Sequence, residues 1–225
     1  MRRMIRSAAV CRYLVVLAAA TRLGAVTCLA DEPASLKLLR PTPHPVVQRE
    51  GFDPRVAHEH QSGGPALGHG EVPLEIELSL AAALGDAKVQ WRAVLYEGAY
   101  GRSVDWSDVE GTLEGNRWHA NLRLPAGGWY RLEVRLRGGE KSLAETHVEP
   151  VGVGELFLVA GQSYAVGAND EIMKVTDPLA RVVAFDPRAD AWRVAHDPQP
   201  NAGDGGTIWP VLGDLLVPFA RVPVG

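Results

Sequence analysis

The chain has 225 residues, of which 46% are hydrophobic and 22% are charged, and its length corresponds to one large domain or two small ones. This apolar fraction excludes wholesale disorder, and no apolar run reaches the ~20 residues of a spanning helix, which excludes a multi-span membrane protein. The formal net charge is −4, but residues 1–30 carry five Arg and no acid, so the remainder has 18 basic and 27 acidic residues. Because no basic patch stands out in that remainder, we expect no nucleic-acid partner.

Residues 1–30 have the pattern of a secretory signal peptide. Three arginines lie within the first six residues, residues 13–20 form a short apolar core, and Cys28-Leu29-Ala30 supplies small residues for cleavage before Asp31. We therefore predict a secreted or periplasmic protein that is cleaved near Ala30. Both cysteines, Cys11 and Cys28, would leave with this segment, so the mature chain would have no disulfide, no Cys-ligated zinc and no Cys nucleophile.

Residues 31–71 are rich in Pro, Gly and His and are predicted to form a linker with one short strand at Val46–Gln48. Three histidines of this region, at positions 58, 60 and 69, allow two interpretations. They form either a metal cluster or a set of solvated loop side chains. Because they have no fixed periodicity and a Gly-Gly-Pro segment separates them, the second interpretation is preferred and no metal site is predicted.

Residues 72–150 alternate between apolar and polar side chains with a period of two. The pattern is clearest at residues 74–80, 117–124 and 130–137, and Val89–Tyr96 and Leu143–Val148 add further candidate strands. Glycine-containing turns separate these segments. We predict an antiparallel β-sandwich of roughly immunoglobulin-like size.

The pattern changes after residue 150. Leu156–Ala160 is a continuous apolar run, which fits a central parallel strand covered on both faces. Two short strands are predicted at Arg181–Phe185 and Trp192–Ala195. A helix is predicted from about Ile208 to Ala220, with Thr207 as its cap, Pro210 in its first turn and Pro218 as a kink or stop. The last four residues resemble the start of another strand.

Gly161-Gln162-Ser163 follows directly after the predicted buried strand. A serine at a strand-to-helix junction exposes its hydroxyl, while its own N–H can point into the same cavity, so the position suits both nucleophilic attack and oxyanion stabilisation. The alternative is a serine that only caps a helix.

Residues 154–163, Gly-Glu-Leu-Phe-Leu-Val-Ala-Gly-Gln-Ser, resemble the first block of the SGNH-hydrolase superfamily, in particular its sialate O-acetylesterase and carbohydrate-esterase branch. Tyr164 departs from the Asn usual there, which affects the expected local hydrogen bonding. Val46-Val-Gln-Arg49 and the strands up to Val148 are similar to the β-sandwich that often precedes the catalytic domain. The resemblance implies an α/β fold with an N-terminal all-β domain: an antiparallel β-sandwich followed, at residues 151–225, by a partial flavodoxin-like (SGNH-type) α/β/α domain.

The resemblance also implies roles for individual residues. Ser163 would be the nucleophile and an oxyanion donor through its N–H, and Gly206 or Gly205 would supply a second N–H, unless this glycine pair is only a flexible turn. Asn169 is too close in sequence to serve as the family's distant Asn. The family's Asp-x-x-His does not occur after Ser163, where His196 is the only histidine. We therefore expect a truncated catalytic domain of low activity, with no cofactor.

Two functions follow as hypotheses. The first is a secreted serine esterase that removes O-acetyl groups from an acetylated carbohydrate, a substrate implied by the resemblance alone. The second is a non-catalytic carbohydrate- or partner-binding β-sandwich, in which exposed Trp91, Trp106, Trp118 and Trp129 would stack on sugar rings. Burial of these tryptophans would favour the first hypothesis.

Overall fold

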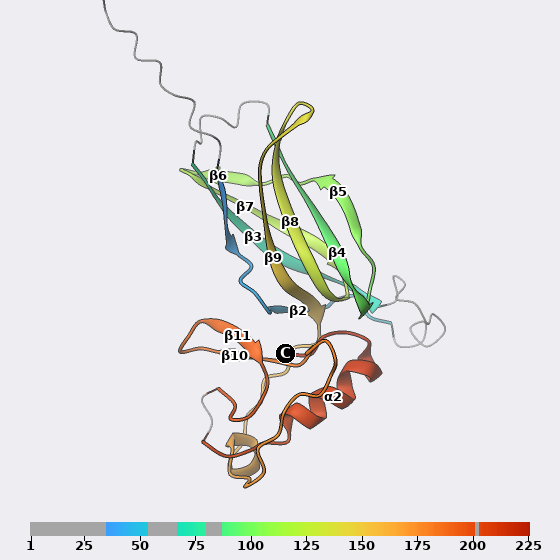
Figure 1. Cartoon of the computed structure of the whole chain (residues 1–225), viewed down its shortest axis with the longest axis vertical. Coiled ribbons are helices and arrows are strands. Elements are labelled where there is room, and N and C mark those ends of the chain that lie inside the picture. Colours follow the sequence, from blue (N-terminus) through green and yellow to red (C-terminus); the bar gives the residue numbers. More distant parts are fainter. Residues whose placement is uncertain (1–34, 54–66, 80–86, 201–202) are drawn as a thin grey trace, which may run out of the picture. The chain divides into compact units, whose positions relative to one another are not determined.

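The computed structural model describes residues 35–53, 67–79, 87–200 and 203–225 (Figure 1). Contacts divide the chain after residue 32, and all described residues belong to the second unit, Pro33–Gly225. The signal peptide predicted for residues 1–30 lies outside the described residues.

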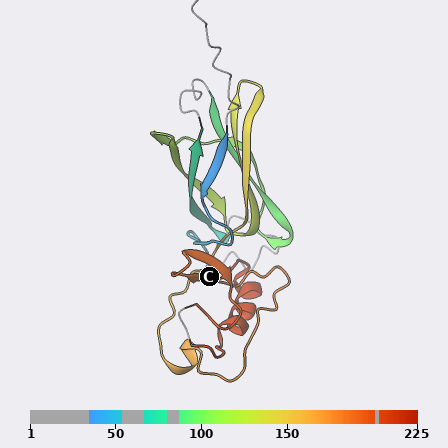
Figure 2. The ribbon, with the colours of Figure 1, turned by 60° about the vertical axis from the view of Figure 1, so that its left-hand side comes forward.

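Two β-sheets face each other across one apolar core (Figures 1 and 2). The first sheet has the strand order β1 (Leu36–Arg40), β3 (His69–Leu78), β7 (Arg117–Pro125) and β6 (Thr112–Glu114), and all its neighbouring strands are antiparallel. The second sheet has the order β2 (Val46–Gln48), β9 (Lys141–Gly154), β8 (Gly127–Gly138), β4 (Lys88–Tyr100) and β5 (Val104–Asp108). In this sheet β2 pairs with β9 in parallel, and the other pairs are antiparallel.

The period-2 pattern of the sequence accounts for the core. In β3 and β7 the register places Leu74 opposite Ala120 and Ile76 opposite Trp118, and both β3 residues are fully buried. In β8, Tyr130, Leu132 and Val134 are buried, while the residues between them face outward. Since each large apolar side chain contributes roughly 1.5–3 kcal/mol when fully buried, this shared core is the main stabilising feature of the two sheets.

The segment predicted as a linker contributes to both sheets. β1 joins the edge of the first sheet, and β2 joins the edge of the second. β9 continues to Gly154, so it runs across the predicted boundary at residue 150. His58 and His60 lie outside the described residues, whereas His69 begins β3.

The fold class predicted from the sequence, with a flavodoxin-like α/β/α domain, is wrong. The described residues are mostly β, with three sheets, one α-helix and no α/β/α layer. After Gly154 the chain forms a short 3₁₀ helix η3 (Ser163–Val166), a hairpin of β10 (Val183–Asp186) and β11 (Ala191–Val194), and helix α2 (Trp209–Ala220). One helix cannot cover both faces of a sheet, as such a fold requires.

The run Leu156–Ala160, predicted to be a buried central strand, is the clearest difference. It forms no strand and is exposed throughout, and Leu158 is 98% exposed. Only its start is paired: the Phe157 N–H donates to the Gly225 carbonyl at 2.9 Å. Val224 forms isolated parallel bridges with both Glu155 and Val182. The apolar run therefore meets the sequence requirement for a buried strand without having the neighbours that would bury it.

The hairpin and the helix were predicted close to their observed bounds. Within α2, Pro210 lies in the first turn and Pro218 lies inside the last turn, after which the helix ends at Ala220. The Thr207 hydroxyl accepts a hydrogen bond from the Trp209 N–H at 3.3 Å, so Thr207 caps the helix start, although Ile208 is the N-cap residue.

Side chains of the Gln48-Arg49 pair hold the end of β9. The Arg49 guanidinium donates to Glu155 Oε1 at 2.7 Å and to the Ala220 carbonyl at 3.2 Å, and it lies over the Phe52 ring. Gln48 accepts the Leu156 N–H at 2.9 Å. We call Gln48, Arg49 and Glu155 the β9 clamp. It fixes the chain direction at the start of the exposed run that leads to Ser163.

We expect His44 to make the stability of the fold depend on pH. Its ring meets the buried Trp129 edge-on at 6.1 Å, and burial lowers its pKa below the ordinary value of 6.5. Between its folded pKa and about pH 6.5, His44 therefore binds more protons in the unfolded chain than in the folded chain, and the stabilisation from neutral His44 is lost as the pH falls through this range. We expect the melting temperature to fall between pH 7.5 and 5.5, and to fall less in His44→Asn. Asn is the control of choice because it tolerates the left-handed backbone at this position (φ 65°). An equal fall in both proteins would contradict the assignment to His44.

Candidate functional site

Ser163 lies on a sharp turn. It is the first residue of η3, directly after the extended Gln162, and its φ is +52°, in the left-handed region. That conformation costs a non-glycine residue roughly 1–2 kcal/mol. Ser163 is exposed, and its hydroxyl makes no hydrogen bond with any described residue. A serine nucleophile on a strained turn ahead of a helix has its hydroxyl presented to solvent in the same way.

The glycine loop that the sequence singled out lies beside η3. The Gly203 N–H donates to the Val166 carbonyl, and the Gly205 N–H donates to the Gly167 carbonyl at 3.1 Å. Gly206 and Asn169 exchange two hydrogen bonds, at 2.8 and 3.2 Å. The structure therefore brings the loop at 203–206 against residues 166–169, three to six residues after Ser163.

These hydrogen bonds also limit the loop's chemistry. The N–H groups of Gly205 and Gly206 already donate to carbonyl oxygens, so in this arrangement neither is free to bind an oxyanion. Gly206 is buried, and a Cβ at this position would collide with the Glu171 carbonyl. An oxyanion role for either glycine would require the loop to separate from residues 167–169.

Asp197 anchors the loop and the start of α2. It is 8% exposed and accepts the Thr207 N–H at 2.9 Å, the Thr207 hydroxyl at 2.7 Å and the Met173 N–H at 3.1 Å. The Gln199 amide donates to it as well, at 3.1 Å. Four donors on one buried carboxylate satisfy it without a cationic partner. A second tie comes from Trp209, whose indole N–H donates to the Ala165 carbonyl within η3 at 3.0 Å.

His196, the one histidine after Ser163, is not positioned as a base for Ser163 in this structure. Its Nδ1 accepts the Val175 N–H at 3.0 Å, so the neutral ring carries its proton on Nε2. The carboxylate of its neighbour Asp197 already accepts hydrogen bonds from Thr207 and Met173. No described histidine or carboxylate hydrogen-bonds to Ser163, so the structure shows a candidate nucleophile without a partnered base.

Three of the four sandwich tryptophans named as candidate sugar platforms are buried. Trp91, Trp118 and Trp129 are 7%, 6% and 2% exposed. The faces of the fourth, Trp106, are approached by two guanidinium groups, of Arg135 at 4.0 Å and Arg92 at 4.8 Å. The four therefore do not form a stacking surface.

Sequence reasoning missed the two most connected polar residues near the site. Asp197 and Arg49 had no pattern that distinguished a buried hub from a loop Asp or a strand-end Arg. In the described residues no group of three His, Cys, Asp or Glu could hold a metal ion, and no described helix is long and apolar enough to cross a membrane.

Comparisons with known proteins add no assignment. No protein-family model matches the chain, and no curated protein matches it significantly. The likeness of residues 154–163 to the esterase block is therefore carried by those residues alone.

Proposed function

We propose that the chain is a secreted serine esterase that acts on acetyl esters of carbohydrate, with Ser163 as its nucleophile. The observation that carries the proposal is the conformation of Ser163: an exposed serine with φ +52° that begins a 3₁₀ helix directly after the extended Gln162. Strain of this kind is retained where the surrounding structure enforces it, and it concentrates at functional sites.

One further feature supports the proposal. The burial of Trp91, Trp118 and Trp129 removes the aromatic platform on which the binding-module alternative depended. The carbohydrate substrate and the acetyl group rest on the resemblance of the serine block.

The proposed reaction is acyl transfer through Ser163. Its hydroxyl adds to the acetyl carbonyl, and its proton passes to the sugar oxygen, which leaves as the alcohol. Water then adds to the acetyl-serine, releases acetic acid and restores the Ser163 hydroxyl. The serine hydroxyl is a weak nucleophile without a base to take its proton. Since no described side chain provides that base in this arrangement, we propose a slow reaction.

The test is hydrolysis of an aryl acetate by the full chain beside its Ser163→Ala variant. We expect a rate far below the ~10 s⁻¹ of a typical enzyme, and complete loss of the excess over buffer in Ser163→Ala. Ser142→Ala is the matched control, because Ser142 is an exposed serine on β9 that pairs only with Glu145. Turnover that survives Ser163→Ala would remove the nucleophile assignment.

A second variant separates the roles of serine and histidine. In His196→Asn the amide oxygen can still accept the Val175 N–H, while the titratable ring is lost. We expect unchanged turnover, since His196 does not contact Ser163. Loss of activity in both Ser163→Ala and His196→Asn would instead identify His196 as the base.

A further inference from the structure

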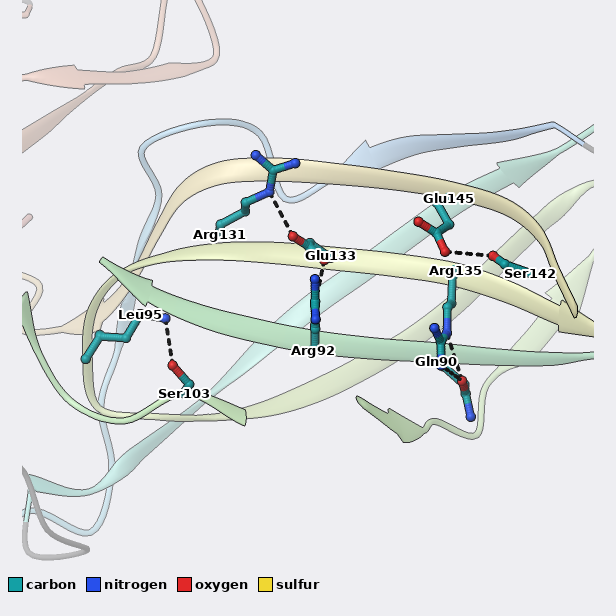
Figure 3. A network of polar contacts seen from close by, with 9 residues as sticks. All are labelled: Gln90, Arg92, Leu95, Ser103, Arg131, Glu133, Arg135, Ser142 and Glu145. Atoms are coloured by element: carbon teal, nitrogen blue, oxygen red, sulfur yellow. Dashed lines mark hydrogen bonds and ion pairs between the residues drawn. The ribbon is translucent and has the colours of Figure 1, made fainter. Parts of the chain in front are cut away.

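The outer face of the five-stranded sheet carries polar side chains that pair with one another (Figure 3). Glu133 on β8 accepts Nε–H groups from Arg92 at 2.6 Å and from Arg131 at 2.9 Å. Arg135 on the same strand donates two N–H groups to Gln90 Oε1, at 2.9 and 2.8 Å. Because these groups satisfy one another within the fold, this face gives no reason to expect a partner.

Helix α2 differs from that face because it is apolar on both of its sides. The buried side consists of Pro210, Gly213 and Val217. The helix has one charged residue, Asp214, whose carboxylate accepts the N–H groups of Thr176 at 2.7 Å and Asp177 at 3.0 Å. Its only charge is therefore already paired within the protein. A helix that is apolar all round is normally covered on every side.

The side of α2 opposite the buried residues carries an exposed apolar stripe. We call its four members the α2 stripe: Ile208, Leu212, Leu215 and Phe219. Leu215 and Phe219 are 66% and 78% exposed. At 3.6 residues per turn, the four lie within about 60° of one another around the helix. Their intervals of four, three and four residues are those of the a/d positions through which two helices pack.

The segment before Ser163 adds exposed apolar surface beside this helix. Arg49 contacts both Glu155 and the last residue of α2, while the indole of the first residue of α2 donates to the Ala165 carbonyl at 3.0 Å. Residues 155–165 therefore run alongside α2 in the opposite direction. Within this segment, the side chains at 156–159 are all exposed.

The exposed apolar area is large enough for a stable interface. The α2 stripe, Val211 and residues 156–159 together expose the equivalent of about five complete large side chains. One such side chain presents on the order of 150 Å², so the patch offers roughly 750 Å². Each partner in a stable complex buries about 800 Å², and interfaces of mainly apolar composition are typical of permanent homodimers.

We propose that the α2 stripe is the interface of a homodimer, in which α2 packs antiparallel against α2 of a second copy. A two-fold axis places the same patch on both subunits, so the patch must be complementary to itself. Around an axis midway between Leu212 and Leu215, each Leu212 meets Leu215 of the second copy, and each Ile208 meets Phe219. Antiparallel helices also place opposite ends of their macrodipoles side by side. The interface does not depend on the esterase proposal.

The experiment is sedimentation equilibrium of the full chain, with a charge pair placed across the interface. Leu215→Glu and Leu212→Lys each put a charge opposite a leucine, so each variant alone should dimerise at least tenfold more weakly than the wild type. In an equimolar mixture the two introduced charges face each other, and we expect a heterodimer at least fivefold tighter than either variant's homodimer. Melting temperatures establish that both variants remain folded.

The control is Val94→Glu, at an exposed apolar position of the sandwich, which should leave dimerisation unchanged. A mixture that dimerises no better than the separate variants would overturn the antiparallel interface. Wild-type association that continues past the dimer without saturating would show indiscriminate aggregation and would also overturn it. A wild-type monomer that binds phosphatidylcholine vesicles, with binding lost in Leu215→Glu, would assign the stripe to a lipid surface instead.

Discussion

Replacing Arg49 by Met should lower the free energy of unfolding by about 3 kcal/mol. The Arg49 side chain is 2% exposed, and it pairs with Glu155 while its Nη1 serves the Ala220 carbonyl. Met keeps much of the apolar stem and removes the charge, so the half-buried Glu155 carboxylate loses its cationic partner and keeps only the Gln48 donor, and the Ala220 carbonyl loses its Arg49 donor. The loss should be measured by urea denaturation at pH 7.

A matched control is available on the outer sheet face. Arg131 pairs with Glu133 and Glu149 but has a side chain 39% exposed, so Arg131→Met should cost less than ~1 kcal/mol. Similar losses in the two variants would show that the β9 clamp is an ordinary surface ion pair. We also expect Arg49→Met to increase proteolysis between residues 155 and 163, because Arg49 fixes the start of that segment through Glu155.

Self-association should be a dominant solution property of the chain, and Leu158→Lys combined with Phe219→Lys should reduce it at least tenfold. Of 17 exposed large apolar side chains in the described residues, 13 lie between residues 156 and 219, and Leu158 and Phe219 are 98% and 78% exposed. Burying one Leu or Phe contributes roughly 1.5–3 kcal/mol, and each ~1.4 kcal/mol changes an association constant tenfold.

The measurements are sedimentation velocity at micromolar concentrations and the fluorescence of a dye that binds exposed apolar surface. Because neither side chain is buried, the melting temperature should not fall in the double variant. The control is Val94→Lys, which places the same charge on an exposed apolar position of the sandwich (38% exposed) and should leave self-association unchanged. A wild-type chain that sediments as a monomer with low dye fluorescence would contradict the prediction.

Strands β3, β7 and β8 were predictable because each carries its own evidence, whereas β1, β5 and β6 were not predicted. One face of β3, β7 and β8 is buried, so apolar residues recur at every second position, and a reader of the sequence can assign both the strand and its inward face. Helix α2 was predictable for a similar reason, since Thr207 and Pro210 mark its start locally.

The prediction of a buried strand at residues 156–160 was wrong for the opposite reason. A continuous apolar run indicates a strand that is more stable when both faces are buried. Burial, however, depends on neighbouring strands or helices that other segments must supply. Here Val224 and its adjacent residues pair only with the beginning of the run, at Glu155 and Phe157. The α/β/α layers expected from the resemblance therefore do not appear, although the local pattern resembles the one that such layers produce.

The sequence by itself determined the candidate nucleophile, the Gly-rich loop, and the alternating strands of the sandwich, because these depend on residue type and local spacing. Only the tertiary structure decided which polar groups are already paired. It assigned the N–H groups of Gly205 and Gly206 to Gly167 and Asn169, His196 Nδ1 to Val175, and Asp197 to Thr207. It also paired the Arg135 guanidinium, on the central strand β8, with the Gln90 amide oxygen. The physical reason is that a hydrogen bond or ion pair joins groups far apart in the chain, and its partner is fixed by the packing of whole elements rather than by the residues next to it.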